Sequence, residues 1–288
     1  MSNFSQTLSI IREKSINDNE LGTSFEQLSK VFLENDDIQV QEYSDVWFYK
    51  DWAKDKPKYS NIDIGIDLVA KLKYEDGYCA VQCKCYKEDH SISKADLDSF
   101  ISASSTDDFR RLMLIDTSIK PLSNNAQKVF GNLNKDYIRI QNSELSNSRI
   151  DWKNYVTNQK VTLNKKKDPF DHQIKAINAV SEHFKESDRG KLIMACGTGK
   201  TFTALRIAEK LAGPGKVVLY MVPSLSLMSQ TIREWKKECS TEFIAFSACS
   251  DKKIGKKKKS DDLIDIEISD LAFPATTDPK KLANQLNQ

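Results

Sequence analysis

The sequence has no long hydrophobic run and no strong excess of charge of one sign. No stretch approaches the roughly 20 consecutive apolar residues of a membrane-spanning helix, and the N-terminal segment is polar and charged. Lysine and arginine number 43 and aspartate and glutamate 41, so net charge gives no overall positive field for nucleic acid, and any such surface must be local. We therefore expect a cytoplasmic globular protein, and its 288 residues suffice for two modest domains or one large one.

Paired CxxC spacing is also absent from the six cysteines. Cys79, Cys83 and Cys85 fall on the apolar face of one expected strand, where cysteines behave as small hydrophobic side chains. We therefore expect buried, reduced thiols in preference to a metal cluster.

Residues 61–86 contain the most informative pattern, two short apolar runs joined by an Asp-Gly pair at residues 76–77. An acidic residue followed by glycine between strand-like runs predicts a β-hairpin. Asp67 lies in an otherwise hydrophobic part of the first strand, where an unpaired carboxylate would be costly to bury. Gln82 and Lys84 share one face of the second strand. A metal ion, or the lysine across the hairpin, would remove the cost of burying the carboxylate.

A helical stripe precedes the hairpin, with apolar residues at spacings of four, three and four: Leu21, Phe25, Leu28 and Phe32. Glu26 adjoins this stripe, and two interpretations of it remain open. It could lie at the edge of the core and point toward the hairpin. It could equally close a capping box with Thr23, whose S/T-x-x-E pattern lets the glutamate bond back to the cap amide.

Residues 38–60 are rich in tryptophan and tyrosine interleaved with lysines. Such a segment can form a surface for nucleic-acid backbone and bases. Large rings more often bury most of their area while the lysines stay in solvent, and we favour this core interpretation. After the hairpin, a helix, a strand, a helix and a strand follow over residues 93–141. This order predicts a small mixed sheet with helices on its faces.

A polar segment that ends in three lysines before Pro169 is the best candidate for a domain boundary. We therefore predict a first domain over residues 1–150, a linker over 151–168 and a second domain over 169–288. In the second domain, expected strands at 190–195, 217–222 and 242–246 alternate with expected helices. Strands that alternate with helices in this way predict a parallel, doubly wound sheet.

Residues 194–201 follow the first of these strands and precede a helix, and they match most of the phosphate-loop pattern G-x-x-x-x-G-K-[ST], with Met194 at the first glycine position. Gly197, Thr198 and Gly199 can turn backbone amides inward as a nest for phosphate oxygens. Lys200 would reach the β and γ phosphates of ATP. Thr201 would offer its hydroxyl to the Mg²⁺ ion that bridges these phosphates.

This loop resembles that of superfamily-two helicases and translocases, in the form found in restriction-enzyme motors. Gln173 resembles the glutamine that reads adenine ahead of the loop, and residues 222–230 and 276–279 resemble elements that contact the DNA strand. The acidic box of the DExH type and the second motor lobe have no match before Gln288. Phosphoryl transfer depends on positioned metal and charge, so we expect the chain to bind ATP weakly at best and not to hydrolyse it.

The resemblance extends upstream. The elements G-x-x-F-E at residues 22–26, D-x-G-I-D at 63–67 and Q-C-K at 82–84 resemble the Mrr-type branch of the PD-(D/E)xK nucleases. Such a nuclease joined to a superfamily-two motor resembles the front end of the Type ISP restriction-modification enzymes. The resemblance implies a mixed nuclease sheet with flanking helices, followed by a partial RecA-like parallel sheet. Methyltransferase and target-recognition parts are expected to be absent from this chain.

The resemblance also implies a mechanism, Mg²⁺-assisted hydrolysis of double-stranded DNA. Glu26 and Asp67 would hold one or two Mg²⁺ ions, assisted by Gln82, which offers one oxygen and no charge where the broader superfamily has a carboxylate. Lys84 would orient the attacking water and offset charge in the transition state. Asp63 is a weaker ligand candidate. The alternative is a non-catalytic remnant that binds DNA or nucleotide without turning either over, and a free-standing motor is disfavoured.

Overall fold

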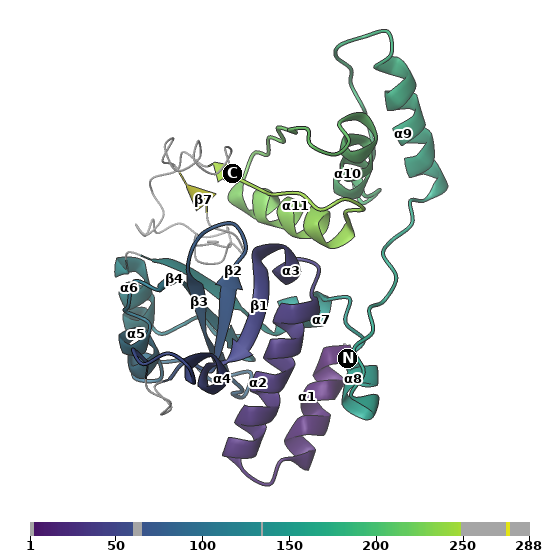
Figure 1. The fold of residues 1–288 in the computed structure, drawn as a ribbon. Coiled ribbons are helices and arrows are strands. Elements are labelled where there is room, and N and C mark those ends of the chain that lie inside the picture. The colour runs from purple at the N-terminus through teal and green to yellow at the C-terminus, as the bar shows by residue number, and fades with distance from the viewer. Residues whose placement is uncertain (1–2, 60–64, 134, 249–274, 277–288) are drawn as a thin grey trace. The chain divides into compact units, whose positions relative to one another are not determined.

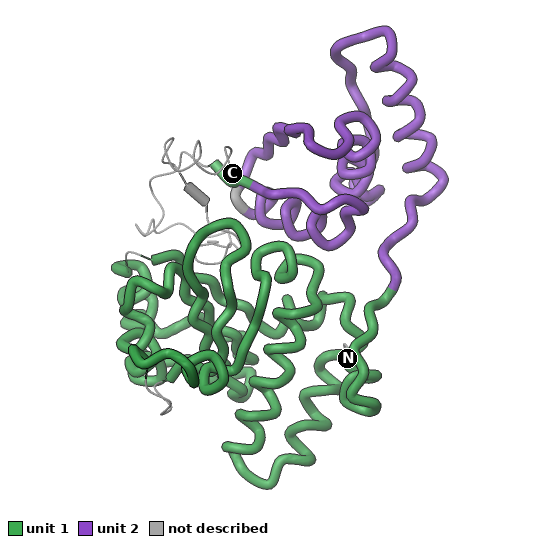
Figure 2. The backbone as a smooth tube through the Cα atoms, in the orientation of Figure 1, with its two compact units in different colours: residues 1–164, 246–288 green, residues 165–245 purple. Residues whose placement is uncertain are grey.

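The structure, a computed structural model, describes residues 3–59, 65–133, 135–248 and 275–276. The chain divides into two compact units, one formed by residues 1–164 with 246–288 and the other by residues 165–245 (Figure 2). No helix among the described residues has the length and apolar character needed to cross a membrane.

The first unit is built on a five-stranded mixed sheet with the strand order β1-β2-β3-β4-β5. β1, β2 and β3 are antiparallel, whereas β3, β4 and β5 are parallel. The strands are β1 (Tyr43–Phe48), β2 (Leu68–Leu72), β3 (Tyr78–Lys84), β4 (Phe109–Asp116) and β5 (Asp136–Ile140). The predicted hairpin is confirmed as β2 and β3. Gly77 in its turn has a φ of 131°, a conformation that favours glycine.

Helices cover both faces of the sheet (Figure 1). On one face, a core cluster includes residues of α1 (Asn3–Lys14), α2 (Asp18–Asn35), α7 (Asn142–Asn147) and α8 (Trp152–Asn158). On the other face, the cluster includes residues of α4 (Tyr49–Ala53), α5 (Asp98–Ala103) and α6 (Asn124–Asn132). A short helix, α3 (Gln39–Glu42), precedes β1. The small mixed sheet with helices on its faces agrees with the predicted α/β class.

The aromatic segment before the hairpin is core, as favoured above. Tyr49 is 2% exposed and Trp52 is 4% exposed, and both belong to the second cluster. The Lys56 ammonium lies 4.6 Å from the centroid of the Trp52 ring and donates to the Trp52 carbonyl at 2.9 Å. The same segment also contains β1, an edge strand that was not predicted from the sequence.

Part of the expected linker is an ordered helix. Residues 152–158, which the sequence assigned to a linker, form α8. Trp152 is 1% exposed, and its ring centroid lies 5.0 Å from that of Phe4. Its indole N–H donates to the carbonyl of Leu145 at 2.9 Å. The linker prediction was therefore wrong here, because a helix with two buried residues among polar ones has almost no apolar periodicity to detect.

Truncating this anchor is expected to destabilise the first unit. Trp152→Ala should lower the free energy of unfolding by about 3–5 kcal/mol, since the change leaves a cavity against Phe4 and removes a buried hydrogen bond. Urea denaturation followed by circular dichroism measures the change. Lys153→Ala, at an exposed position of the same helix, should shift the value by about 0.5 kcal/mol or less. Equal midpoints for the two variants would contradict this account of α8.

The second unit contains α9 (Asp171–His183), α10 (Lys200–Leu211) and α11 (Leu225–Glu238), packed around Leu205, Trp235 and Cys239. The three strands expected at residues 190–195, 217–222 and 242–246 do not pair in the described part of the chain. Val217 is 85% exposed, and Leu219 and Met221 are each 84% exposed. These strand predictions were wrong for the structure, because an apolar run becomes a strand only where a neighbour accepts its backbone hydrogen bonds. A short parallel pair, β6 (Ser247–Ala248) with β7 (Ala275–Thr276), belongs to the other unit.

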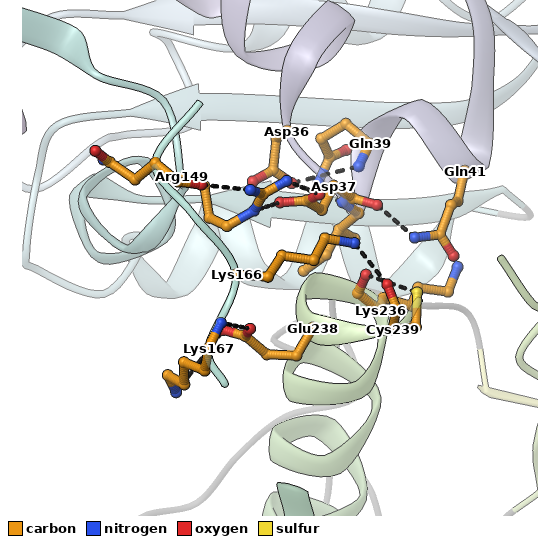
Figure 3. Close-up of polar contacts among 12 residues, drawn as sticks. Asp36, Asp37, Gln39, Gln41, Arg149, Lys166, Lys167, Lys236, Glu238 and Cys239 are labelled. Atoms are coloured by element: carbon orange, nitrogen blue, oxygen red, sulfur yellow. Dashed lines mark hydrogen bonds and ion pairs between the residues drawn. The ribbon is translucent and has the colours of Figure 1, made fainter. Parts of the chain in front are cut away.

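Charged side chains secure segments within each unit (Figure 3). In the first unit, Arg149 donates to both oxygens of Asp37, each at 2.6 Å. In the second unit, the Lys167 backbone N–H donates to Glu238 at 2.9 Å and the Lys166 ammonium to the Cys239 carbonyl at 2.6 Å. The lysine-rich segment is therefore tied to the end of α11, although its composition indicated a free linker.

Candidate nuclease and nucleotide sites

Asp67 ends the ladder of the hairpin, one residue before β2. Its backbone N–H donates to the Val81 carbonyl, and its carbonyl accepts from the Tyr49 N–H, both at 2.9 Å. One carboxylate oxygen accepts from the Cys83 backbone N–H at 2.6 Å. The side chain thus takes the place that a strand carbonyl would fill, which fixes the carboxylate beside the end of β3.

Gly65 allows the chain to reach this position. Its φ is 89°, a conformation that L side chains rarely adopt. A Cβ atom at this residue would lie 2.6 Å from the Ser99 hydroxyl oxygen and 2.9 Å from the Phe100 nitrogen. The glycine of the D-x-G-I-D element is therefore required both by backbone conformation and by the close approach of α5.

Glu26 lies inside α2 and does not cap it. The helix begins at Asp18, and the Asn17 side chain caps it by accepting from the Glu20 N–H at 2.9 Å. The capping interpretation of Glu26 with Thr23 was wrong, because both residues lie beyond the first turn. Glu26 is half-buried on a helix that packs against β3.

The thiol of Cys83, near the end of β3, lies close to charged residues of the predicted site. Burial, followed by the negative charges of Asp67 and Glu26, raises the pKa of the Cys83 thiol well above its ordinary value, while the positive charge of Lys84 opposes the shift. The geometry beside this thiol is the Asp67 carboxylate on the Cys83 backbone N–H, Lys84 as the next residue of β3, and α2, the helix of Glu26, packed against the strand. Cys79, Cys83 and Cys85 are all free thiols, and burial raises the pKa of Cys79 to about 12.

Gln82 supplies a buried oxygen without a partner. The side chain is 2% exposed, and its Oε1 accepts no hydrogen bond within the described residues. Leu68 pairs with Val81 in the hairpin, so the next step of the register sets Asp67 beside Gln82. A buried acceptor left unsatisfied costs about 1–3 kcal/mol, and a cation would satisfy it.

The donor set fits a hard divalent cation. Two carboxylates and an amide carbonyl are oxygen ligands of the kind Mg²⁺ takes, with water completing its shell. Within the described ranges, no group of three or more His, Cys, Asp or Glu side chains could hold a metal ion. The candidate set has only two such side chains, Glu26 and Asp67, because Gln82 stands in place of a third acidic residue. Asp63, the weaker candidate, lies outside the described residues.

The phosphate loop adopts the backbone that its glycines permit. Gly197 and Gly199 both have a φ of 77°, and α10 begins at Lys200 directly after them. The loop closes on itself through the Ala195 carbonyl, which accepts from the Thr198 hydroxyl at 2.8 Å and from the Lys200 ammonium at 3.0 Å. The Thr201 carbonyl accepts from the Trp235 indole at 2.9 Å, which ties the first turn of α10 to α11.

Gln173 is brought against this loop from α9. It is 4% exposed, accepts from the Phe170 N–H at 2.9 Å and donates to the Thr198 carbonyl at 3.0 Å. A Cβ atom at Gly199 would overlap the Gln173 amide nitrogen, so the glycine is needed for this approach. Of the two expected DNA-contacting elements, residues 222–230 include the Ser224-capped start of α11. Of the other, Thr276 lies in β7 and residues 277–279 lie outside the described part.

In comparisons with known proteins, two successive parts of the chain match two different families. Residues 34–162 match a restriction endonuclease family of the Mrr type, and residues 166–285 match the family of the Type III restriction enzyme res subunit. No curated protein matches the chain.

Among solved structures, the ATP-dependent Type ISP restriction-modification enzyme LlaBIII bound to DNA matches with 32% identity and a TM-score of 0.75 over 94% of this chain. A nuclease-deletion mutant of the Type ISP enzyme LlaGI, in complex with a DNA substrate mimic, matches 42% of this chain with 39% identity and a TM-score of 0.34. The matches cover 17% and 11% of those two chains. The chain therefore joins an Mrr-type restriction endonuclease domain to a helicase-like domain of the res-subunit family, as in the Type ISP restriction-modification enzymes that it resembles.

Proposed function

We propose that the first unit is a Mg²⁺-dependent endonuclease that hydrolyses phosphodiester bonds of double-stranded DNA. The observation that carries this proposal is the Asp67 carboxylate, held by the Cys83 N–H at the end of β3, next to Lys84 and on a strand against which the helix of Glu26 packs. The buried, unpartnered oxygen of Gln82 lends further support.

Each residue has a distinct role in this proposal. Glu26 and Asp67 hold the ion with two negative charges, and Gln82 adds an uncharged oxygen. Held by these residues, a Mg²⁺ ion would supply Lewis-acid chemistry, polarising the scissile phosphate and lowering the pKa of a water molecule. Lys84 supplies positive charge where negative charge develops on the phosphate and orients the attacking water. The hydrogen bond from Cys83 to Asp67 keeps the carboxylate in place while the other side chains bind.

Supercoiled plasmid provides the test. Incubation with the chain and Mg²⁺ should yield nicked circles, chelation of the metal should stop the reaction, and Lys84→Ala should not nick. The same reactions with ATP added ask whether nucleotide changes the rate. Retention of plasmid in a gel-shift assay without any metal-dependent nicking would favour the alternative, a DNA-binding remnant without catalysis.

We further propose that the second unit binds ATP, with residues 197–201 around the phosphates and Gln173 at the adenine. The positive-φ glycines before α10 and the buried contact from Gln173 to the loop support this placement. Lys200 would exchange the Ala195 carbonyl for phosphate oxygens.

Removing the loop lysine is expected to weaken nucleotide binding. Lys200→Ala should raise the dissociation constant of a fluorescent ATP analogue by about tenfold or more, equivalent to about 1.4 kcal/mol. The reason is that the variant lacks the positively charged ammonium that would face the phosphates. Fluorescence anisotropy measures the change. Lys191→Ala, an exposed lysine upstream of the loop, is the matched control and should bind as the parent chain does. Equal affinities for all three proteins would contradict the assignment of the loop.

A further inference from the structure

A buried ion pair lies at the ends of β4 and β5. Asp116 is completely buried, and the Arg139 side chain is 8% exposed. The guanidinium donates to both carboxylate oxygens, from Nε at 2.7 Å and from Nη2 at 3.0 Å. The Ser118 backbone N–H adds a third hydrogen bond to the carboxylate at 2.9 Å. Both oxygens of Asp116 are therefore held by groups other than the proposed site.

The ion pair is next to the proposed catalytic lysine. In the parallel pair β3 and β4, Lys84 is in register with Asp116, and the Thr117 N–H donates to the Lys84 carbonyl at 3.2 Å. Strand alternation sets Lys84 on the face of Ala80 and Asp116 on the face of Leu114, and these two apolar residues belong to the same core cluster. A lysine and an aspartate thus lie side by side on one face of the sheet.

Such neighbours ordinarily attract, because opposite charges on adjacent strands stabilise a sheet. Within the described residues, however, Asp116 pairs with Arg139 and forms no ion pair with Lys84. Lys84 directly follows Cys83, whose backbone N–H donates to the Asp67 carboxylate at 2.6 Å. The carboxylate in register with Lys84 is thus held by an arginine, at the end of the strand that also positions Asp67.

We propose that Arg139 is a positioning residue for the nuclease. By holding Asp116 in a bidentate ion pair, it prevents this carboxylate from capturing the Lys84 ammonium, which stays available for the scissile phosphate. The inference rests on the proposed nuclease function and adds a residue on β5 to it. A purely structural role for the pair, joining β4 to β5, makes different predictions for the variants below.

A charge-deletion cycle separates the two roles. Arg139→Gln leaves Asp116 without its cation, so Asp116 pairs with Lys84 and plasmid nicking falls by about tenfold or more. The double variant Asp116→Asn with Arg139→Gln removes the competing carboxylate and keeps two amides that can bond to each other. Its nicking rate should return to within about threefold of the parent. Arg139→Lys, which keeps a cation, should stay close to the parent. A folded double variant as inactive as Arg139→Gln would overturn the inference.

The reactivity of Lys84 gives a readout that does not depend on cleavage. A lysine paired with a carboxylate holds its proton more tightly and reacts more slowly with an acylating reagent. Peptide mass spectrometry should therefore show slower acylation of Lys84 in Arg139→Gln and recovery in the double variant, with exposed Lys71 as the internal reference.

The two proposals fail in different ways. An unchanged Lys84 rate in Arg139→Gln would overturn the positioning role even if the parent chain nicks DNA. Absence of nicking by the parent chain would refute the nuclease function, and the acylation rates would still decide whether Arg139 controls Lys84. If Arg139→Gln does not fold, the double variant decides: recovery of both nicking and Lys84 reactivity supports the role, and a folded protein with neither overturns it.

Discussion

Replacing Asp67 by alanine is expected to lower the rate of Mg²⁺-dependent nicking by about a thousandfold. This is the upper end of the range for loss of one group that stabilises a transition state. The proposed site has only two carboxylates because Gln82 carries no charge, so the change removes half of the negative charge that holds the ion. It also leaves the Cys83 N–H without its acceptor. Initial nicking rates over a Mg²⁺ titration measure the first effect, and calorimetry with Mn²⁺ measures the loss of metal binding.

Two control variants separate metal binding from folding. Asp67→Asn keeps an oxygen that can accept from the Cys83 N–H but removes the charge, so the fold should persist while metal affinity and nicking are lost. Asp45→Ala removes an exposed carboxylate from β1 and should behave as the parent chain does. Parent-like nicking by Asp67→Ala would refute the assignment of the metal site.

Replacing Lys84 by alanine should have a comparable effect on cleavage and the opposite effect on metal binding. Nicking should fall by about a hundredfold to a thousandfold because the charge that offsets the developing anion is gone. Affinity for the metal should be kept or increased, because a positive charge has been removed from the proposed cation site. The same plasmid and calorimetric assays report both quantities.

The matched control is Lys71→Ala, an exposed lysine on the adjacent strand of the hairpin. It should leave both quantities unchanged. A Lys84→Ala variant that loses metal binding and cleavage together would show that the lysine maintains the site structurally, and one that cleaves normally would remove it from the mechanism.

The hairpin, and the positions of Asp67, Gln82 and Lys84 on it, were predictable from sequence because strand periodicity and the Asp-Gly turn are local signals. The role of Glu26 was harder to predict. Its stripe predicted the helix, but the choice between a capping and a site role depended on where the helix begins. The cap at Asn17 excludes the capping role, and the site role of Glu26 stays a prediction.

Two elements without a clear helical or strand periodicity were missed. α8 depends on Trp152 and Tyr155 among polar neighbours, and β1 lies in a segment whose aromatic density suggested core without indicating a strand. In the second unit, apolar runs indicated strands, but pairing needs a partner, and a single run carries no information about one. The helices, whose hydrogen bonds are internal, formed as expected.

The sequence gives little indication of the ion pair between Asp116 and Arg139. Asp116 stands at the end of an apolar run and Arg139 alternates with isoleucines in a short strand. Charged residues within buried strands are uncommon and usually paired. The sequence could therefore have indicated two charges that need partners, but their pairing across β4 and β5 depends on the tertiary register.

The hydrogen bond from the Cys83 amide to the Asp67 carboxylate makes that amide proton a natural spectroscopic reporter. A proton shared with a carboxylate at 2.6 Å resonates according to the electron density on the oxygen. A cation drawing on the same carboxylate withdraws that density and moves the resonance, whereas DNA bound elsewhere leaves it in place. One backbone signal thus reports occupancy of the proposed ion site, without any added label near the reacting atoms.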